Sequence, residues 1–549
     1  MPDQSSAPSN VPSLIQKKSF TRSAGIVSIG VMGSRVLGLV REKVIAYYFA
    51  SGIGGDAIYA AFRIPNLLRD LFAEGAMSKA FITTFTDTEM KDGPDAAWQL
   101  ANRTLNVLGL VLAIITCIGI LIAPQIVDVM LAGKGFDTVL DANAHFGFSD
   151  KRMLTVYLTR IMFPFLMLVS FAAIAMGVLN SKGIFGIPAW ASSFFNVTAL
   201  VVGVAGYYLL PEFGLHPTTG MAIGFLAGGA AQLLVQIPSM YKVGFRYRPL
   251  ISFRDHRVRQ VLRLMGPAIL GAAALQVNIF ANAYFASYGE GWLTWITRAF
   301  RLLHLPIGVF GVAISTVVLP NLAKQVAAGQ IDNFNNSFSR AMRLVFFLAI
   351  PSTFGLIILA EPICRLIFEG GAAGDLDTVQ TANALFFYAI GLCGYSAVKI
   401  TTDGFYAFKN TKTPVKVSLA TIALNIFLNY LFIMHLGLDH RSLALSTAIT
   451  ITLNFSILLF LLRRKVGRLG GREISRTILK VLAASALMAL ACWWALRWIE
   501  STLGTASFAV QCLGVFAPIL VALAVFVGMC KAMRVRELGE ILKAIRKKK

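Results

Sequence analysis

The chain has 549 residues, of which 56% are hydrophobic and only 14% are charged, and its formal net charge is +23. A soluble globular domain carries about 25% charged residues, so this composition excludes a soluble enzyme, a disordered scaffold and a disulfide-rich secreted domain. It is typical of a polytopic membrane protein. In such a protein the number of Lys and Arg residues differs between the two sides of the membrane, so their distribution is considered first.

Long apolar segments follow one another through the whole chain. A spanning helix needs about 20 mostly apolar residues, and fourteen segments meet this requirement. In chain order they are 24–50, 57–86, 104–123, 156–179, 188–208, 221–240, 264–286, 293–320, 344–360, 383–408, 417–434, 443–462, 481–496 and 509–530. The first, second and eighth are long and contain charges, so we expect bends in them. The pattern predicts an all-α polytopic membrane protein without a soluble domain between its spans.

The basic residues between the spans predict the topology. If the N-terminus is cytoplasmic, the segments on the cytoplasmic side hold 34 Lys and Arg residues, whereas those on the opposite side hold 6. This asymmetry follows the positive-inside rule, so both termini are predicted to be cytoplasmic. The residues before the first span lack a separate apolar stretch, so no cleavable signal peptide is expected. Most of the positive charge is then a topology signal and an attraction to anionic lipid, and we predict no nucleic-acid partner.

Other chemistries have little support in the sequence. The six cysteines show no CxxC spacing, and of the six histidines only His304 lies in a predicted span. We therefore expect no metal site. The phosphate-binding pattern GxxxxGK[ST] is absent, and no Ser/His/Asp or paired-carboxylate arrangement stands out. The sequence predicts neither an enzyme nor a protein that hydrolyses ATP itself.

Charged residues inside the spans are the main functional signal. An arginine near a helix centre costs about 2.5–3.5 kcal/mol on insertion scales, so such side chains face a bundle interior or a wet cavity. The basic residues within spans are Arg35, Arg41, Lys43, Arg63, Arg69, Lys79, Arg160, Arg298, Arg301 and Lys399. The acids are Glu42, Asp70, Glu74 and Asp403. The acids are too few to pair every base, which favours an anionic substrate that supplies the missing charge.

Four arginines are predicted near the membrane midplane. At 1.5 Å per residue, Arg35 lies about 16 Å into the first span and Arg69 about 20 Å into the second. Arg41 and Arg301 lie about 14 Å from the outer ends of their spans. If these spans face one another, the four side chains form a cationic chamber. A planar guanidinium is the better partner for phosphate because it binds two oxygens at once.

Two plainer interpretations stay open. Lys43, Lys79 and Arg160 could extend to an interface. The second span could also hold an internal ion-pair network that only locks two helices, made of Arg63, Arg69, Asp70 and Glu74.

A weak internal repeat divides the spans into two lobes of six. The tetrapeptide YFAS at 48–51 recurs at 284–287, and such repeats suit alternating access around a midplane site. The predicted organisation is a cytoplasmic segment 1–23, an N-lobe 24–240, a basic linker 241–263, a C-lobe 264–462, a basic loop 463–480, a final helix pair 481–530 and a basic tail 531–549. A two-lobe cavity does not require an oligomer.

Several sequence blocks resemble the MurJ (MviN) lipid II flippases of the MOP exporter superfamily. The most specific are SRVLGLVRE at 34–42, then Asp56, FRIPNLLR at 62–69 and FAEGA at 72–76. Further matches are MGPA at 265–268, LPIG at 305–308, TVVLP at 316–320, GFY at 404–406 and KTP at 412–414.

The resemblance implies two six-helix lobes around a central cavity, with two further helices forming a groove for a polyprenyl tail. It implies alternating-access transport of undecaprenyl-diphosphate-linked disaccharide-pentapeptide (lipid II) outward across the bacterial inner membrane for peptidoglycan synthesis. Membrane lipids and other cell-wall synthesis proteins are the further partners. The central arginines of the family match Arg35, Arg41, Arg69 and Arg301, and its functional lysine matches Lys399. No cofactor is implied, and coupling to the membrane potential or to a monovalent ion stays open.

This sequence departs from the family pattern around its eighth span. The family usually has acids where this chain has Phe300 and His304, and Arg298 adds a base. The position after Arg69 is commonly basic but is Asp70 here. The departures affect the expected ion pairing of the eighth span and leave the arginine set unchanged.

The sequence predicts a lipid II flippase in which Arg35, Arg41, Arg69 and Arg301 hold the diphosphate. The supporting cavity or gate residues are Glu42, Asp56, Arg63, Asp70, Glu74, Arg298, His304 and Lys399. The alternatives are a flippase for another polyprenyl-diphosphate glycan and an ion-coupled multidrug exporter, which would favour embedded acids. A glycosyl- or phosphotransferase would need a catalytic carboxylate cluster, and a scaffold would not need midplane arginines.

Overall fold

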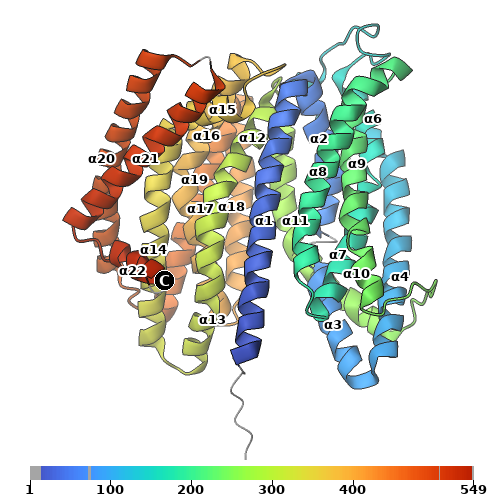
Figure 1. The fold of residues 1–549 in the computed structure, drawn as a ribbon, viewed down its shortest axis with the longest axis horizontal. Coiled ribbons are helices and arrows are strands. Elements are labelled where there is room, and N and C mark those ends of the chain that lie inside the picture. Colours follow the sequence, from blue (N-terminus) through green and yellow to red (C-terminus); the bar gives the residue numbers. More distant parts are fainter. Residues whose placement is uncertain (1–13, 72–75, 506, 547–549) are drawn as a thin grey trace, which may run out of the picture. The chain divides into compact units, whose positions relative to one another are not determined.

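The computed structural model describes residues 14–71, 76–505 and 507–546 and is built from helices (Figure 1). Within these ranges there is no strand beyond two isolated bridges, Val139 with Asp150 and Gly370 with Ala373. The chain forms two compact units. The first contains 1–41, 61–123 and 156–272, and the second contains 42–60, 124–155 and 273–549. The two units are defined by contacts between residues and not by the sequence repeat. They do not test the lobe boundaries predicted from the repeat, which stay a prediction.

The first unit is made of long helices and parts of helices that continue into the second. They are α1 (Leu14–Phe49), α2 (Ile53–Arg69), α3 (Ala76–Asp92), α4 (Pro94–Leu121), α5 (Ala123–Met130), α6 (Lys151–Met162), α7 (Phe165–Ser181), α8 (Gly186–Leu209), α9 (Thr218–Leu234), α10 (Ile237–Lys242) and α11 (His256–Ala286). The division between the units falls within α1, α2, α5, α6 and α11. The apolar core of the first unit joins α3, α4 and α7 around Phe81, Phe85 and Leu166.

Helices α8 and α9 approach each other closely because small residues face one another. A Cβ added to Gly220 would lie 2.6 Å from the backbone carbon of Gly206, and one added to Gly224 would lie 2.6 Å from the carbonyl oxygen of Ala199. Glycine therefore lets the two backbones touch, as at other membrane helix interfaces.

The second unit contains the remaining helices of the chain. They are α12 (Trp292–Pro306), α13 (Ala313–Ala327), α14 (Ile331–Ile358), α15 (Ala360–Phe368), α16 (Asp375–Ile390), α17 (Leu392–Ala407), α18 (Lys412–Tyr430), α19 (His440–Val466), α20 (Gly471–Leu503), α21 (Phe508–Ala532) and α22 (Arg536–Arg546). Its core packs α14, α17, α20 and α21 together around Phe338, Phe405 and Phe526. The predicted spans missed the short helices α5, α15 and α22, which are too brief for a search based on spanning length.

Within the described ranges, the fourteen predicted segments fall mainly on helical stretches. Among the described residues, however, nine helices are long and apolar enough to cross a membrane, or ten if the bent pair α16–α17 is one span. The fourteen-span count is therefore not confirmed by this criterion. Helices α1, α2, α3, α11, α12 and α13 do not meet it. The protein is an all-α, multi-pass membrane protein.

Of the three spans in which bends are expected, the eighth shows a break within the described residues. The second span is divided between α2 and α3, and residues 72–75 lie outside the described ranges. In the eighth, α12 ends at Pro306 and a π-helical turn, Ile307–Val312, leads into α13. Proline removes a backbone hydrogen bond, which accounts for this break. The first span differs, because α1 is uninterrupted from Leu14 to Phe49.

Candidate substrate-binding site and its supporting ion pairs

Asp56, in the first turn of α2, is fully buried in the second unit. Its carboxylate accepts hydrogen bonds from the backbone N–H groups of Gly291 and Thr294, at 2.8 and 3.0 Å, and from the Thr294 hydroxyl at 2.6 Å. The ammonium of Lys151, also fully buried, lies 2.7 Å from Oδ2. Because Gly291 directly precedes α12, Asp56 caps that helix from another helix and neutralises the positive end of its dipole. The carboxylate thus fastens α2 to α12.

Arg298 on α12 is the largest fully buried side chain among the described residues. Its Nη2 donates to the carbonyl oxygen of Ala50 at 2.6 Å, and its Nη1 lies 3.8 Å from Oδ2 of Asp377. Asp377, in the first turn of α16, also accepts hydrogen bonds from the Ser51 backbone N–H at 3.0 Å and from the Trp295 indole at 2.8 Å. Arg298 therefore joins the turn after α1 to α12 and α16, and its burial excludes direct contact with a bound molecule in this conformation.

Arg301 lies three residues further along α12 and differs sharply from Arg298. Its side chain is 33% exposed, and its Nη1 donates to Oε1 of Glu42. Glu42 is only 1% exposed, and its second oxygen accepts a hydrogen bond from the Tyr59 hydroxyl. The carboxylate thus holds one edge of the guanidinium, while part of the side chain stays open to a ligand. The structure brings together two predicted site residues here, Arg301 and Glu42.

Arg41 is held inside the first unit, where it is 6% exposed. Its Nη1 donates to Oδ1 of Asn196 at 3.0 Å, and its guanidinium lies over the rings of Phe195 and Phe225 at 5.4 and 5.2 Å. Asn196 also donates to the carbonyl oxygen of Ser34. Cation–π contacts and an amide oxygen thus stabilise this charge.

The other embedded charges of the first unit are more open. Arg35 and Arg63 are half-buried, on α1 and α2. Arg69 donates two hydrogen bonds to Oδ1 of Asp70, from Nη2 at 2.8 Å and from Nε at 3.2 Å. Glu74, the remaining member of the expected network, lies outside the described residues. Asp70 therefore supplies the charge that partners Arg69 here.

Two predicted supporting residues are exposed on the second unit. His304 has Nδ1 2.9 Å from the carbonyl oxygen of Phe300, and the two rings are in edge contact at 4.3 Å. Lys399 lies on α17 one turn before Asp403, which is buried and accepts a hydrogen bond from the Ser315 hydroxyl.

Arg35, Arg41 and Arg69 belong to the first unit, and Arg301 belongs to the second. The chamber in which all four meet therefore stays a prediction, as do their roles in binding. The sequence interpretation missed the partners that fix these charges, namely Lys151, Asp377, Asn196, Tyr59 and Thr294. The predicted spans place Lys151 in the outer loop between 123 and 156, whereas the structure has it at the start of α6. A buried acid at Asp56 needs a cation, but the sequence does not indicate which of the distant bases provides it.

In the parts of the chain that the structure describes, no group of three or more His, Cys, Asp or Glu side chains is placed to hold a metal ion. Each unit holds embedded guanidinium groups with carboxylate, amide or aromatic partners. Such an arrangement can bind an anion, and it provides electrostatic attraction and hydrogen bonds.

The fold defines the class of the protein. The chain is similar to a solved structure described as the inward-facing conformation of a multidrug resistance MATE family transporter of the MOP superfamily. The two align with a TM-score of 0.66 and 14% identity, over 81% of this chain and 98% of the other. At this identity the likeness concerns the fold alone, which is that of MOP superfamily transporters.

The family follows from closer similarities. The family described as "Lipid II flippase MurJ" matches residues 45–514. A protein of Vibrio cholerae named "Probable lipid II flippase MurJ" is 33% identical over 489 residues, which cover 89% of this chain and 90% of that protein. A solved structure described as "Lipid II flippase MurJ, inward closed conformation" has a TM-score of 0.73 and 26% identity, over 92% of this chain and 99% of that one. This chain belongs to the MurJ lipid II flippase family.

Proposed function

We propose that this protein moves lipid II, the undecaprenyl-diphosphate-linked precursor of peptidoglycan, from the inner to the outer leaflet of the bacterial inner membrane. The observation that carries the proposal is the family match over residues 45–514. It is supported by the relative from Vibrio cholerae named a probable lipid II flippase, which this chain matches over 90% of that protein's length. The substrate has a diphosphate, and the chain provides embedded arginines of the kind that bind phosphate oxygens.

In this proposal Arg301 exchanges one anionic partner for another. Glu42 occupies one edge of the guanidinium, and a diphosphate would occupy the part that stays exposed. Asp70 plays the same part for Arg69. A resident carboxylate lowers the cost of keeping a guanidinium in the membrane between transport cycles, because an unpaired charge there is expensive. Arg35 and Arg41 complete the set that holds the diphosphate and the nearby sugar.

The polyprenyl tail stays in lipid in this proposal, along α20 and α21. Both termini are cytoplasmic, as the distribution of basic residues predicts.

The surplus of embedded positive charge makes return of the unloaded protein sensitive to the membrane potential, by about 2.3 kcal/mol per elementary charge per 100 mV. Sealed vesicles in which the potential is set with a potassium gradient and valinomycin test this coupling. Equal transport rates at all potentials would contradict it.

The main test is depletion of the protein from its native cell followed by measurement of lipid II in each leaflet. Lipid II should accumulate in the inner leaflet, and wild-type protein should restore its export. Arg301→Gln should not restore export, whereas Lys324→Gln, which removes an exposed positive charge from the end of α13, should. Accumulation of another polyprenyl-linked glycan would change the substrate, and no accumulated lipid at all would contradict a flippase.

A further inference from the structure

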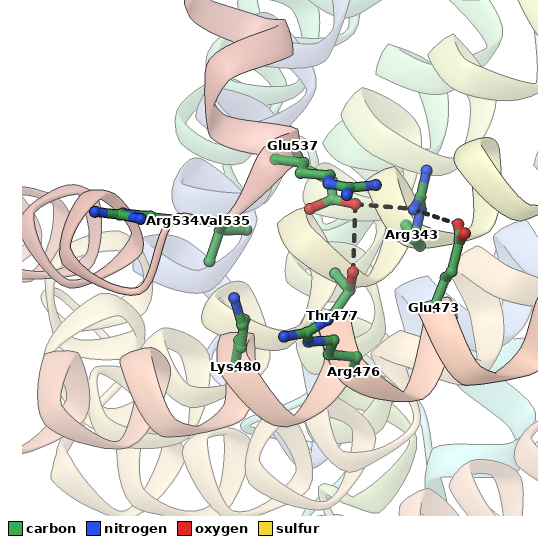
Figure 2. A pocket seen from close by; sticks show the side chains of 9 residues that line it. Arg343, Glu473, Arg476, Thr477, Lys480, Arg534, Val535 and Glu537 are labelled. Carbon is green, nitrogen blue, oxygen red and sulfur yellow. Dashed lines mark hydrogen bonds and ion pairs between the residues drawn. The ribbon is translucent and has the colours of Figure 1, made fainter.

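A cavity of about 360 Å³ lies beside the C-terminal helix in the second unit, between residues of α14, α20 and the start of α22 (Figure 2). Its lining is strongly basic. Five basic side chains and two acidic ones face it, and the basic ones are Arg343, Arg476, Lys480, Arg534 and Arg536. None of these residues belongs to the site described above.

The two acids of this cavity are both paired with Arg343. Its Nη1 lies 2.8 Å from Oε2 of Glu473, and its Nε lies 3.2 Å from Oε1 of Glu537. The hydroxyl of Thr477 donates to the same Glu537 oxygen at 3.3 Å (Figure 2). Arg343 and Glu537 are largely buried, so this cluster forms a fixed wall that joins the first turns of α20 and α22 to α14.

The remaining basic side chains keep their charge available. Lys480 donates to the carbonyl oxygen of Met533 at 2.7 Å, which leaves its positive charge uncompensated. Arg476, Arg534 and Arg536 are exposed and have no acidic partner within the described ranges. With five bases and two acids, the cavity carries a formal charge of +3.

Arg534 occupies a backbone position that favours glycine. Its φ is 50°, and it follows the end of α21, where Val535 N–H donates to the carbonyl oxygen of Cys530 at 2.9 Å. A non-glycine residue in the left-handed region costs roughly 1 kcal/mol, and such positions cluster where a side chain has a function. An arginine at this position is consistent with a role for its charge.

We propose that this cavity binds the phosphate group of an anionic phospholipid headgroup. Guanidinium groups bind phosphate oxygens in pairs, and a volume of about 360 Å³ lies within the range of small-ligand pockets. The lipid is favoured as the source of the phosphate because the cavity lies at the start of α20 and just past the end of α21, two helices that are long and apolar enough to cross a membrane. The acyl chains would stay in the membrane while the headgroup enters the cavity. A soluble phosphate compound shares the recognised chemistry but gains nothing from a site at the membrane surface.

The test uses the full-length protein in neutral phosphatidylcholine nanodiscs, titrated with phosphatidylglycerol and read by native mass spectrometry. The double variant Arg476→Gln, Arg536→Gln should weaken phosphatidylglycerol binding about tenfold. The matched control is Arg468→Gln, Arg472→Gln, which removes two exposed bases close to the start of α20 that do not line the cavity. It should change binding by less than about twofold. The readout does not require transport and is therefore separate from the proposed function.

The outcomes separate the sources of phosphate. Binding that resists an excess of inorganic phosphate but is lost in the cavity variant supports the lipid headgroup. Competition by millimolar inorganic phosphate would overturn the lipid in favour of a soluble ligand. Equal losses in the two double variants, or no loss in either, would overturn the site, because nonspecific attraction to basic residues would then explain the binding. If the double variant does not purify as a folded protein, the single variants Arg476→Gln and Arg536→Gln answer the same question.

Discussion

Arg298 and Arg301 are three residues apart on the same helix, yet their surroundings differ. Arg298 is completely buried and lies between a backbone carbonyl and Asp377, whereas Arg301 is one-third exposed and shares Glu42 with a tyrosine. The first region, with the Asp56–Lys151 pair, has the features of a clamp that fixes the beginning of α12. The second has those of a binding site. Charge inside a membrane span therefore does not by itself indicate substrate contact, because the partners and the remaining exposure decide between the two roles.

The clamp is tested most severely by Asp56→Asn. Asparagine keeps the shape and can still accept from α12, but it leaves the buried Lys151 charge without its counter-ion. Removing one partner of a buried pair costs about 3–5 kcal/mol. We expect a loss of this size in the free energy of unfolding, measured in detergent by denaturant titration. The double variant Asp56→Asn, Lys151→Met should recover more than half of the loss, and a single variant within about 1 kcal/mol of wild type would refute the clamp.

Arg298→Gln should destabilise the protein by about 2–3 kcal/mol, because Asp377 loses its nearby cation and the carbonyl of Ala50 loses a charged donor. The paired variant Arg301→Gln, Glu42→Gln should stay within about 1 kcal/mol of wild type, since it removes both charges of the pair and leaves neither without its counter-ion. Thermal unfolding of the two proteins under identical detergent conditions measures the difference. If the two variants lose the same amount of stability, the distinction between the clamp at Arg298 and the binding region at Arg301 is refuted.

At the binding region, Arg301→Gln, Glu42→Gln should weaken the affinity for lipid II about tenfold, since a charge-assisted hydrogen bond contributes about 1.5–3 kcal/mol. The change is measured by titrating lipid II into protein in nanodiscs. Arg301→Lys should recover part of the affinity because lysine keeps the charge but lacks the planar fork. Wild-type affinity in the double variant would remove Arg301 from the substrate site.

The smallest expected effect comes from an ion pair in the predicted cytoplasmic segment 241–263. Burial raises the pKa of Asp255, but hydrogen bonds from the Arg257 and Val258 backbone N–H groups and from the Arg103 side chain outweigh it, so the pKa is lowered. Its stabilisation is thus present above the unfolded value of about 3.9 and is lost as the pH falls through the lower folded value. Asp255→Asn should cost about 0.2–1 kcal/mol at neutral pH.

The thermal midpoints of wild type and Asp255→Asn, compared at pH 7 and at the lowest pH at which both stay folded, measure this effect. The difference should shrink toward acid. A difference that grows toward acid would reverse the sign of the pKa shift. The result also gives the stability contributed by an ion pair outside the predicted spans. The contributions of the embedded ion pairs can be compared with that value.

The sequence predicted the helical class well, because apolar length is a local property. It also predicted a bend in the eighth span, where the structure has a break after Pro306. Which base meets which acid could not be predicted. Asp56 and Lys151 are separated by 95 residues, and Arg301 and Glu42 by 259. Such pairs depend on how distant helices pack.

Burial of single charges was equally inaccessible to sequence reasoning. Counting depth along a helix placed Arg41 beside an aqueous chamber, but depth says nothing about which side of the helix a residue occupies. The structure surrounds Arg41 with Phe195, Phe225 and Asn196, from α8 and α9. Aromatic residues at those positions are ordinary in a membrane helix, so no sequence signal marked them as partners of a cation.

The capping of α12 by Asp56 has a mechanical consequence. One end of the helix is clamped by the carboxylate, and the other passes into a proline and a π-helical turn, where the regular backbone hydrogen bonds are interrupted. Helix α12 is thus fixed at its N-terminal end and can bend just past its C-terminal end, and Arg301 lies before that bend. Rotation of the chain beyond Pro306 can be absorbed within the turn, so α13 can move while Arg301 and the buried anchor of α12 keep their positions.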